Sequence, residues 1–317
     1  MDRNLALEVV RVTEAAALES ARLMGRGDAA AVDAAAARAM RRAFEAINAD
    51  AVVVIGEGQE GEVEELHLGQ RVGGGSDSVV IDVALDALEG ATVCATGGAN
   101  ALSIILISER GKILRCPETY MEKLAVGPDG KGVVDIDRSP TENLKALAKA
   151  KGVYVADLTA VILDRPRHAR LVDEVRRAGA RVQLLADGDL SAAIATARPG
   201  SDIDILFGIG GAQQGVLAAG ALECLGGEFQ GRFKPLTNDQ VGLLKAAGID
   251  QEKLYKATDL VGDSVMFAAT GVTNGHLLNG VRFHRGGAVT NSVVMRSSTR
   301  TVRWIEAHHH FDFKPDY

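Results

Sequence analysis

The fold is decided by residues 160–187, which read AVILDRPRHARLVDEVRRAGARVQLLAD. A strand pattern at 160–164 is followed by a helical pattern at 168–179, which Gly179 ends, and by a second strand pattern at 181–187. The same alternation continues on both sides, with helical patterns at 140–151, 189–197 and 214–225 and a strand pattern at 203–212. Repeated strand–helix units predict a parallel sheet covered by helices.

The rest of the chain adds helical and strand patterns to this centre. Helical patterns occupy 3–24 and 28–47, and strand patterns occupy 51–56, 79–86, 101–108, 265–272, 287–295 and 299–307. A length of 317 residues fits two domains or one large domain. We predict an α/β protein with an N-terminal α+β domain at 1–155 and a C-terminal α/β domain at 156–317. In this prediction, the strands at the C-terminal end of the chain can pack against the first domain.

Composition excludes several classes of partner. Lys and Arg number 35 against 42 Asp and Glu, a net charge of −7, which argues against nucleic acid and against an anionic membrane. Aromatic residues are only 4% of the chain, too few for a base-stacking platform. The three cysteines form no CxxC pair, and neither a signal peptide nor an uncharged span of about 18 apolar residues is present. We expect a cytoplasmic protein.

Four acids give the first chemical signal. Glu57 directly follows the 51–56 strand pattern, Asp86 and Glu89 follow the 79–86 pattern, and Asp33 lies near the start of a helix. Carboxylates at the ends of neighbouring strands can converge on a hard divalent cation, which also binds phosphate oxygens and activates water. Each acid taken singly is better explained as an ordinary surface residue in a turn.

Glycine turns and arginines give the second signal. IGEG (55–58), DGD (187–189) and GIGGA (208–212) follow strand patterns, and two of them open helices, where backbone amides suit a phosphate. Turns also need glycine for backbone reasons, and GIGGA lacks the full GxGxxG pattern of a dinucleotide site. RPRH at 165–168 places two arginines around a proline, a pattern that can clamp phosphate. His168 is better explained as a capping or packing residue.

Taken together and in this order, the motifs resemble the class II fructose-1,6-bisphosphatases of the lithium-sensitive phosphatase superfamily. The likeness runs along nearly the whole chain through the motifs RVTEAAAL, GRGD with Asp33, VVIGEG, DxxEG, GGANAL, YMEKLAVGP, RPRH, DGD, GIGGA, ATGVT and TRTVRWI.

The resemblance implies a layered α/β/α/β/α sandwich that binds Mg²⁺ or Mn²⁺ in its first domain and a sugar phosphate in its second. The implied reaction removes the 1-phosphate of fructose 1,6-bisphosphate or sedoheptulose 1,7-bisphosphate, by in-line attack of a water molecule activated by the metal. The resemblance also implies a role in gluconeogenesis and a homodimer or homotetramer.

Site residues carry over by matching motif. The implied metal ligands are Asp33, Glu57, Asp86, Glu89 and Gln214, and the implied catalytic residues are Glu57, Asp86 and Glu89. The implied substrate contacts are Glu89, Gly90, Tyr120, Arg165, Pro166, Arg167, Asp187, Gly188, Asp189 and Gly211.

The chain departs from the family pattern at positions that the resemblance implies in metal binding and catalysis. Ala91 stands in the place of a threonine that orients the attacking water, and Gln214 stands in the place of a metal-binding glutamate. Gly61 and Gln59 replace an aspartate and a glutamate. A glutamine keeps the shape of glutamate and one oxygen but loses its charge, which weakens the binding of a divalent cation.

Three interpretations therefore stay open. The first is a working metal-dependent sugar bisphosphatase, slower or with altered use of metals, which the family motifs and the four retained acids favour. The second is a paralogue that isomerises, epimerises or dephosphorylates another phosphorylated sugar, with Asp33, Glu57, Asp86 or His168 in acid–base steps. The third is a non-catalytic binder of sugar phosphates.

Overall fold

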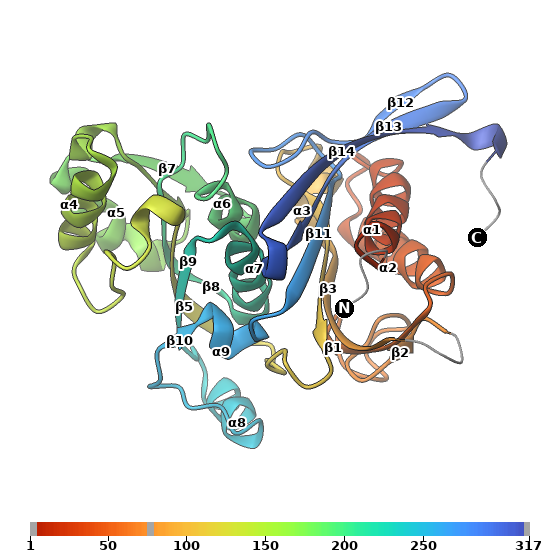
Figure 1. Ribbon diagram of the computed structural model, residues 1–317, viewed down its shortest axis with the longest axis horizontal. Helices are drawn as coiled ribbons and strands as arrows, with labels where there is room; N and C mark the ends of the chain where they lie inside the picture. The colour runs from red at the N-terminus through yellow and green to blue at the C-terminus, as the bar shows by residue number, and fades with distance from the viewer. Residues whose placement is uncertain (1–4, 75–78, 314–317) are drawn as a thin grey trace. The chain divides into compact units, whose positions relative to one another are not determined.

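The computed structural model describes residues 5–74 and 79–313. These residues form two compact units, shown in Figure 1. The first unit combines the residues up to Ile113 with those from Ser264 onward, and the second consists of Leu114–Asp263. The division into domains at residue 155 that the sequence suggests stays a prediction.

The first unit is built on an eight-stranded sheet with the strand order β12-β13-β11-β4-β3-β1-β2, to which β14 adds by pairing with β13. Its strands are β1 (Ala49–Ile55), β2 (Arg71–Val72), β3 (Val79–Glu89), β4 (Leu102–Glu109), β11 (Val265–Gly271), β12 (Arg282–His284), β13 (Gly287–Arg296) and β14 (Thr301–His310). Within the described residues, β1 and β3 are parallel, and the other neighbours are antiparallel. The C-terminal strands β11–β14 thus belong to the same sheet as the N-terminal strands β1–β4.

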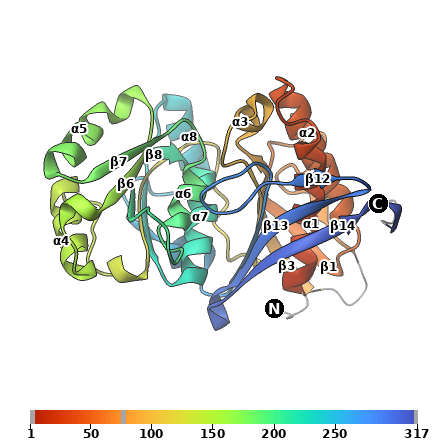
Figure 2. The same ribbon diagram turned by 90° about the horizontal axis from the view of Figure 1, so that it is seen from above.

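Two helices, α1 (Leu5–Ala21) and α2 (Ala29–Phe44), pack against each other and against this sheet (Figures 1 and 2). Helix α2 begins at Asp28, whose side chain accepts a hydrogen bond from the Ala31 N–H at 2.9 Å, as its position in the GRGD motif predicts. Small and apolar side chains of both helices are buried in one core with the strands. A short helix, α3 (Ala91–Thr96), follows β3.

The second unit has a six-stranded sheet in the order β10-β9-β5-β8-β6-β7. Its strands are β5 (Tyr120–Val126), β6 (Thr159–Leu163), β7 (Arg181–Leu185), β8 (Ile205–Gly211), β9 (Glu228–Phe233) and β10 (Tyr255–Lys256). The predicted parallel sheet is confirmed for the three strands that the sequence indicates, β6, β7 and β8. The sequence patterns did not indicate β5, β9 and β10, and β5 lies between β8 and β9 and runs antiparallel to both.

Helices cover both faces of the second sheet. Figure 1 shows α4 (Pro140–Lys151) and α5 (Ala169–Ala178) on one face and α6 (Asp189–Ala195) and α7 (Ala212–Leu225) on the other. Helix α4 starts with a capping box between Ser139 and Glu142, and α5 ends at Gly179 in the left-handed conformation. Two further helices, α8 (Asn238–Ala246) and α9 (Ala257–Val261), follow β9.

Each unit therefore combines a mixed sheet with helices, which confirms the predicted α/β class. Among the helices that the structure describes, none is both long enough and apolar enough to cross a membrane.

Candidate functional site

The predicted site residues fall into two groups, one in each unit, and each group has its own geometry. The first unit holds Asp33, Glu57, Asp86, Glu89 and Gly90. The second unit holds Tyr120, Arg165, Pro166, Arg167, Asp187, Gly188, Asp189, Gly211 and Gln214.

Glu57 lies just beyond the end of β1, and its side chain makes a hydrogen bond to the backbone of β3. Its Oε1 accepts a hydrogen bond from the Ala87 N–H at 2.8 Å. The preceding residue must be glycine for a steric reason, since a Cβ on Gly56 would lie 2.1 Å from the carbonyl oxygen of Leu66. The IGEG turn therefore places a carboxylate against the neighbouring strand by allowing the chain to pass close to residue 66.

Asp86 and Glu89 lie inside β3, and the prediction that they follow the end of a strand is wrong. Strand β3 continues to Glu89, and its register against β4 shifts between these two acids. Such an irregularity re-aims side chains within a strand, and period-two patterning does not reveal it. Glu89 is buried, and Gly90 follows it with a left-handed φ of +84° at the start of α3.

The acids of the first unit act on one another. Burial, together with the negative charges of Asp86 and Asp33, raises the pKa of Glu57 to about 8, and the hydrogen bond from the Ala87 N–H acts in the opposite direction. Burial also raises the pKa of Asp33. These three carboxylates therefore form one electrostatic cluster in which a cation would relieve the repulsion.

The donors fit a hard divalent cation by their chemistry, because Mg²⁺ and Mn²⁺ prefer carboxylate oxygens. Within residues 5–74 and 79–313, no three His, Cys, Asp or Glu side chains lie close enough together to hold a metal ion as they stand. The carboxylates of Asp33, Glu57 and Asp86 would thus have to draw together around an ion that they shared.

In the second unit, a short 3₁₀ helix at Pro166–His168 follows β6, with Arg165 at its N-cap and Arg167 inside it. Arg165 Nη1 donates to the carbonyl oxygens of Asp164 at 2.9 Å and Ala186 at 2.7 Å. Arg167 donates from Nε and Nη2 to the carbonyl oxygen of Ile209, and its guanidinium lies 5.3 Å from the centre of the Tyr120 ring. The backbone thus orients both guanidinium groups, as phosphate recognition requires.

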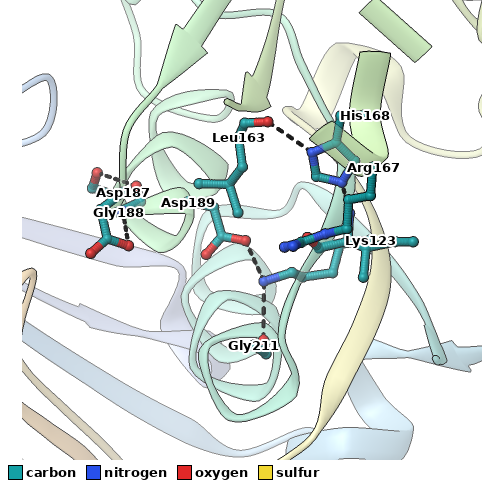
Figure 3. A network of polar contacts seen from close by, with 10 residues as sticks. Lys123, Leu163, Arg167, His168, Asp187, Gly188, Asp189 and Gly211 are labelled. Carbon is teal, nitrogen blue, oxygen red and sulfur yellow. Dashed lines mark hydrogen bonds and ion pairs between the residues drawn. The ribbon is translucent and has the colours of Figure 1, made fainter. Parts of the chain in front are cut away.

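The DGD and GIGGA turns open α6 and α7. Asp187 accepts a hydrogen bond from the Gly188 N–H at 3.0 Å, and Gly188 has a left-handed φ of +82° before Asp189 begins α6. Gly211 precedes the first residue of α7, and Gln214 lies in the first turn of that helix. A Cβ on Gly211 would lie 2.1 Å from Gln214 Oε1, so a larger residue at 211 would displace the end of this side chain. Figure 3 shows Asp187, Asp189 and Gly211 around the start of these helices.

His168 links two strands through both of its ring nitrogens. Nδ1 donates to the carbonyl oxygen of Leu163 at 2.8 Å, and Nε2 accepts from the Ile209 N–H at 2.8 Å. Burial lowers the pKa of this imidazole, which therefore stays neutral. The structure confirms the packing role of His168 and removes it from the candidates for acid–base chemistry.

One buried polar residue of this site is missed by the sequence analysis. Lys123 lies in the middle of β5, its Nζ is 2.5 Å from Asp189 Oδ2, and it donates to the carbonyl oxygen of Gly211 at 3.1 Å (Figure 3). A signal for it exists in YMEKLAV, where a basic residue interrupts an apolar strand pattern.

The departures from the family pattern also have defined positions. Ala91 is the first residue of α3 and directly follows Gly90, the N-cap of that helix. Gly61 has a left-handed φ of +88°, and no atom lies within 4 Å of a Cβ added to it. An aspartate at 61 would therefore be strained by its backbone and not by crowding.

Comparison with known proteins agrees with the motifs. The sequence model of the family described as bacterial fructose-1,6-bisphosphatase, glpX-encoded, matches residues 3–309. Two relatives from Synechococcus elongatus and Synechococcus sp. are each 41% identical, with 98% of both chains aligned. A third from Thermosynechococcus vestitus is 41% identical over 98% of this chain and 97% of its own. All three are named D-fructose 1,6-bisphosphatase class 2/sedoheptulose 1,7-bisphosphatase.

Enzymes of this kind are phosphoric monoester hydrolases, and they generally use divalent metal ions. The match extends over nearly the whole chain and confirms the resemblance that the motifs indicate. The chain belongs to the family of bacterial class II fructose-1,6-bisphosphatases.

Proposed function

We propose that this protein is a metal-dependent phosphatase that releases the 1-phosphate of fructose 1,6-bisphosphate or sedoheptulose 1,7-bisphosphate. Family membership supports the reaction, and the names of the relatives support both substrates. The observation that carries the proposal is the cluster of Asp33, Glu57 and Asp86, in which burial and the charges of the two aspartates raise the pKa of Glu57 to about 8.

The first unit supplies the metal-binding part of the proposed site. Asp33, Glu57, Asp86 and Glu89 would hold Mg²⁺ or Mn²⁺, and the resemblance to the family adds Gln214 of the second unit as a neutral ligand. A bound divalent ion withdraws electrons from phosphoryl oxygens and makes water more acidic. The protein's own contribution is to hold the four carboxylates, of which Glu57 is fixed by the Ala87 N–H. Glu57, Asp86 and Glu89 are the proposed catalytic residues.

The second unit supplies the proposed contacts to the sugar and its second phosphate. Arg165, Arg167 and Tyr120 would bind the phosphate, with Pro166 fixing the turn between the arginines. Asp187 and Asp189 would accept hydrogen bonds from sugar hydroxyls, and the backbone at Gly188 and Gly211 would lie against the ligand. Glu89 and Gly90 are further proposed substrate contacts.

A second candidate function is another reaction on a phosphorylated sugar, such as isomerisation or epimerisation. The neutral residues Ala91, Gln214 and Gly61 favour it, because they remove charge or a hydroxyl from the proposed water-activating part of the site. The pocket residues of the second unit are retained in either case.

We further propose a cytoplasmic, homo-oligomeric enzyme of carbohydrate metabolism that serves gluconeogenesis. All three cysteines are free and buried, which supports a reducing compartment.

The test is phosphate release from fructose 1,6-bisphosphate by the purified protein, with and without Mn²⁺ and beside an active enzyme of the family. Release that depends on the metal supports the proposal. Release at background level by folded protein contradicts it. Consumption of the sugar phosphate without phosphate release would support the second candidate.

A further inference from the structure

Lys123 is a charged residue in the interior of the second unit. It lies in the centre of β5, and only 3% of its side chain is exposed. A buried ammonium is retained only where a counter-charge and hydrogen bonds replace its water. The groups that meet Lys123 are therefore the place to look for its role.

Those groups come from two other elements. Asp189 Oδ2 belongs to the first residue of α6 and lies 2.5 Å from Lys123 Nζ. The carbonyl oxygen of Gly211 belongs to the end of β8, directly before α7, and accepts from the same nitrogen at 3.1 Å. One ammonium group thus ties β5 to the two turns from which α6 and α7 begin (Figure 3).

Two glycines leave space for this lysine. A Cβ on Gly210 would lie 2.7 Å from Lys123 Nζ and 2.1 Å from Asp189 Oδ2. A Cβ on Gly215 would lie 3.3 Å from Lys123 Cδ and 2.9 Å from Met121 Sδ. Gly210, a residue of the GIGGA motif near the end of β8, thus leaves space for the Lys123–Asp189 pair, and Gly215 in α7 leaves space for the stem of the lysine side chain.

We infer that Lys123 is a positioning residue for the sugar-binding side of the site. It fixes one oxygen of Asp189 and the carbonyl of Gly211, so that the second oxygen of Asp189 remains an oriented acceptor. The positive charge of Lys123 also neutralises that of Asp189. Without it, a negatively charged ligand would be repelled by both Asp187 and Asp189. This inference rests on the proposed function, which places Asp187, Asp189 and Gly211 against the sugar.

A merely structural role makes a different prediction. Removing one partner of a buried ion pair leaves the other charge buried and uncompensated, and this destabilises the folded protein. A structural lysine would therefore change the amount of folded enzyme and its apparent kcat, and it would leave KM unchanged.

The decisive variant is Lys123→Met, which keeps an unbranched side chain of similar length and removes the charge. We expect KM for fructose 1,6-bisphosphate to rise about tenfold or more, with kcat within about threefold of wild type. Gly210→Ala keeps every charge but drives a methyl group between Lys123 and Asp189, so KM should rise in the same direction.

Lys151→Met is the matched control. It breaks the ion pair between Lys151 and Asp204, which lies in the same unit and involves none of the proposed contacts. We expect this control to leave KM unchanged. A crystal structure of Lys123→Met is the second measurement, and it should show the Asp189 carboxylate and the Gly211 carbonyl displaced from their wild-type positions.

An unchanged KM in Lys123→Met overturns the inference even if kcat falls. A crystal structure in which Asp189 and Gly211 keep their positions also overturns it. If the wild-type enzyme releases no phosphate at all, the proposed function fails, and the crystal structure still decides whether Lys123 positions these two groups.

Discussion

At the scale of single residues, Glu57 carries the strongest electrostatic signal of the first unit. Its pKa is raised from 4.5 to about 8 by burial and by the charges of Asp86 and Asp33. The folded protein therefore binds a proton at Glu57 that the unfolded chain has released above about pH 5. This excess of bound protons in the folded state means that Glu57 makes stability fall with rising pH, until it ionises near its folded pKa.

We therefore predict that the metal-free protein becomes less stable as the pH rises from about 5 to about 8. Glu57→Gln should remove this part of the dependence and raise the melting temperature at about pH 8, because a neutral amide replaces a repelled carboxylate. Thermal unfolding of both proteins in the presence of a chelator tests it. Identical pH profiles would show that Glu57 is not the group responsible.

The same substitution should harm catalysis. If Glu57 acts as proposed, Glu57→Gln should lower the rate of phosphate release by about 100-fold or more at saturating Mn²⁺. Glu60→Gln removes an exposed acid from the following loop and is the matched control. Comparable activity in Glu57→Gln and wild type would rule out a catalytic role for this carboxylate.

The residues that depart from the family pattern can be tested by reversal. We expect Ala91→Thr combined with Gln214→Glu to raise metal-dependent phosphate release by about tenfold or more, since both changes restore groups that act on water or metal. Adding Gly61→Asp should cost about 1 kcal/mol of stability, because φ at 61 is +88°. The measurements are kcat against Mn²⁺ concentration and urea unfolding. No gain in kcat would show that these positions do not limit the reaction.

At the scale of elements, His168 connects the end of β6 to β8. It satisfies the carbonyl of Leu163 and the N–H of Ile209, and the carbonyl of Ile209 in turn receives Arg167. A Cβ on Gly208, whose φ is +134°, would lie 3.1 Å from this ring. The imidazole thus occupies a space that glycine creates and holds the strand that orients an arginine of the proposed site.

We predict that His168→Ala lowers the free energy of unfolding by roughly 2–4 kcal/mol, because two buried backbone groups lose their partners. The pKa of His168 is lowered in the folded state, so the unfolded chain binds more protons and wild-type stability falls as the pH drops through the ordinary histidine range near 6.5. His168→Ala should lose this fall. Urea unfolding at several pH values tests both effects, with the exposed His284→Ala as control.

Most elements could be predicted from the sequence where local signals agree with tertiary packing. The helical pattern at 140–151 has the same bounds as α4, and Gly179, which the sequence gives as a helix end, ends α5 in the left-handed conformation. The antiparallel placement of β5 could not be predicted, because strand order depends on contacts between segments far apart in sequence. The register shift in β3 could not be predicted either, because it arises from pairing with β4.

The candidate site could be predicted as a set of residue types and not as a geometry. The motifs identify Arg167, Asp189 and Glu57, because glycine turns and acids after strand patterns are local signals. Lys123 was missed because its role depends on Asp189 and Gly211, which reach it only through the pairing of β5 with β8. The family match confirms the kind of enzyme, and the roles of the individual residues remain predictions.

At the scale of the whole molecule, strand β14 bears on the proposed oligomer. Within the described residues it pairs only with β13, over its full ten-residue length, so its other edge is open for pairing. Trp304 lies in this strand with 49% of its surface exposed, and it is the only tryptophan in the sequence. An open edge with a large aromatic side chain is a suitable interface between copies of the chain.

We predict that Trp304→Glu shifts the protein toward smaller assemblies in sedimentation velocity, because a charge at this position opposes association. Dilution of the wild-type protein should shift its tryptophan emission to longer wavelength as the interface opens. Tyr154→Glu, at an aromatic residue of the second unit that is 82% exposed, is the control. Unchanged sedimentation of Trp304→Glu would exclude β14 as the interface.

The position of the second unit in the chain has a consequence for synthesis. Strand β4 pairs with β11, so neighbours in the sheet of the first unit are separated by the whole of residues 114–263. At about 5–20 residues per second, a ribosome needs on the order of ten to thirty seconds to make this insertion. During that time the second unit can fold, but the apolar strand β4 has no partner on the edge that later pairs with β11. The nascent chain is therefore most exposed to aggregation before β11 emerges, and holding chaperones would matter most in that interval.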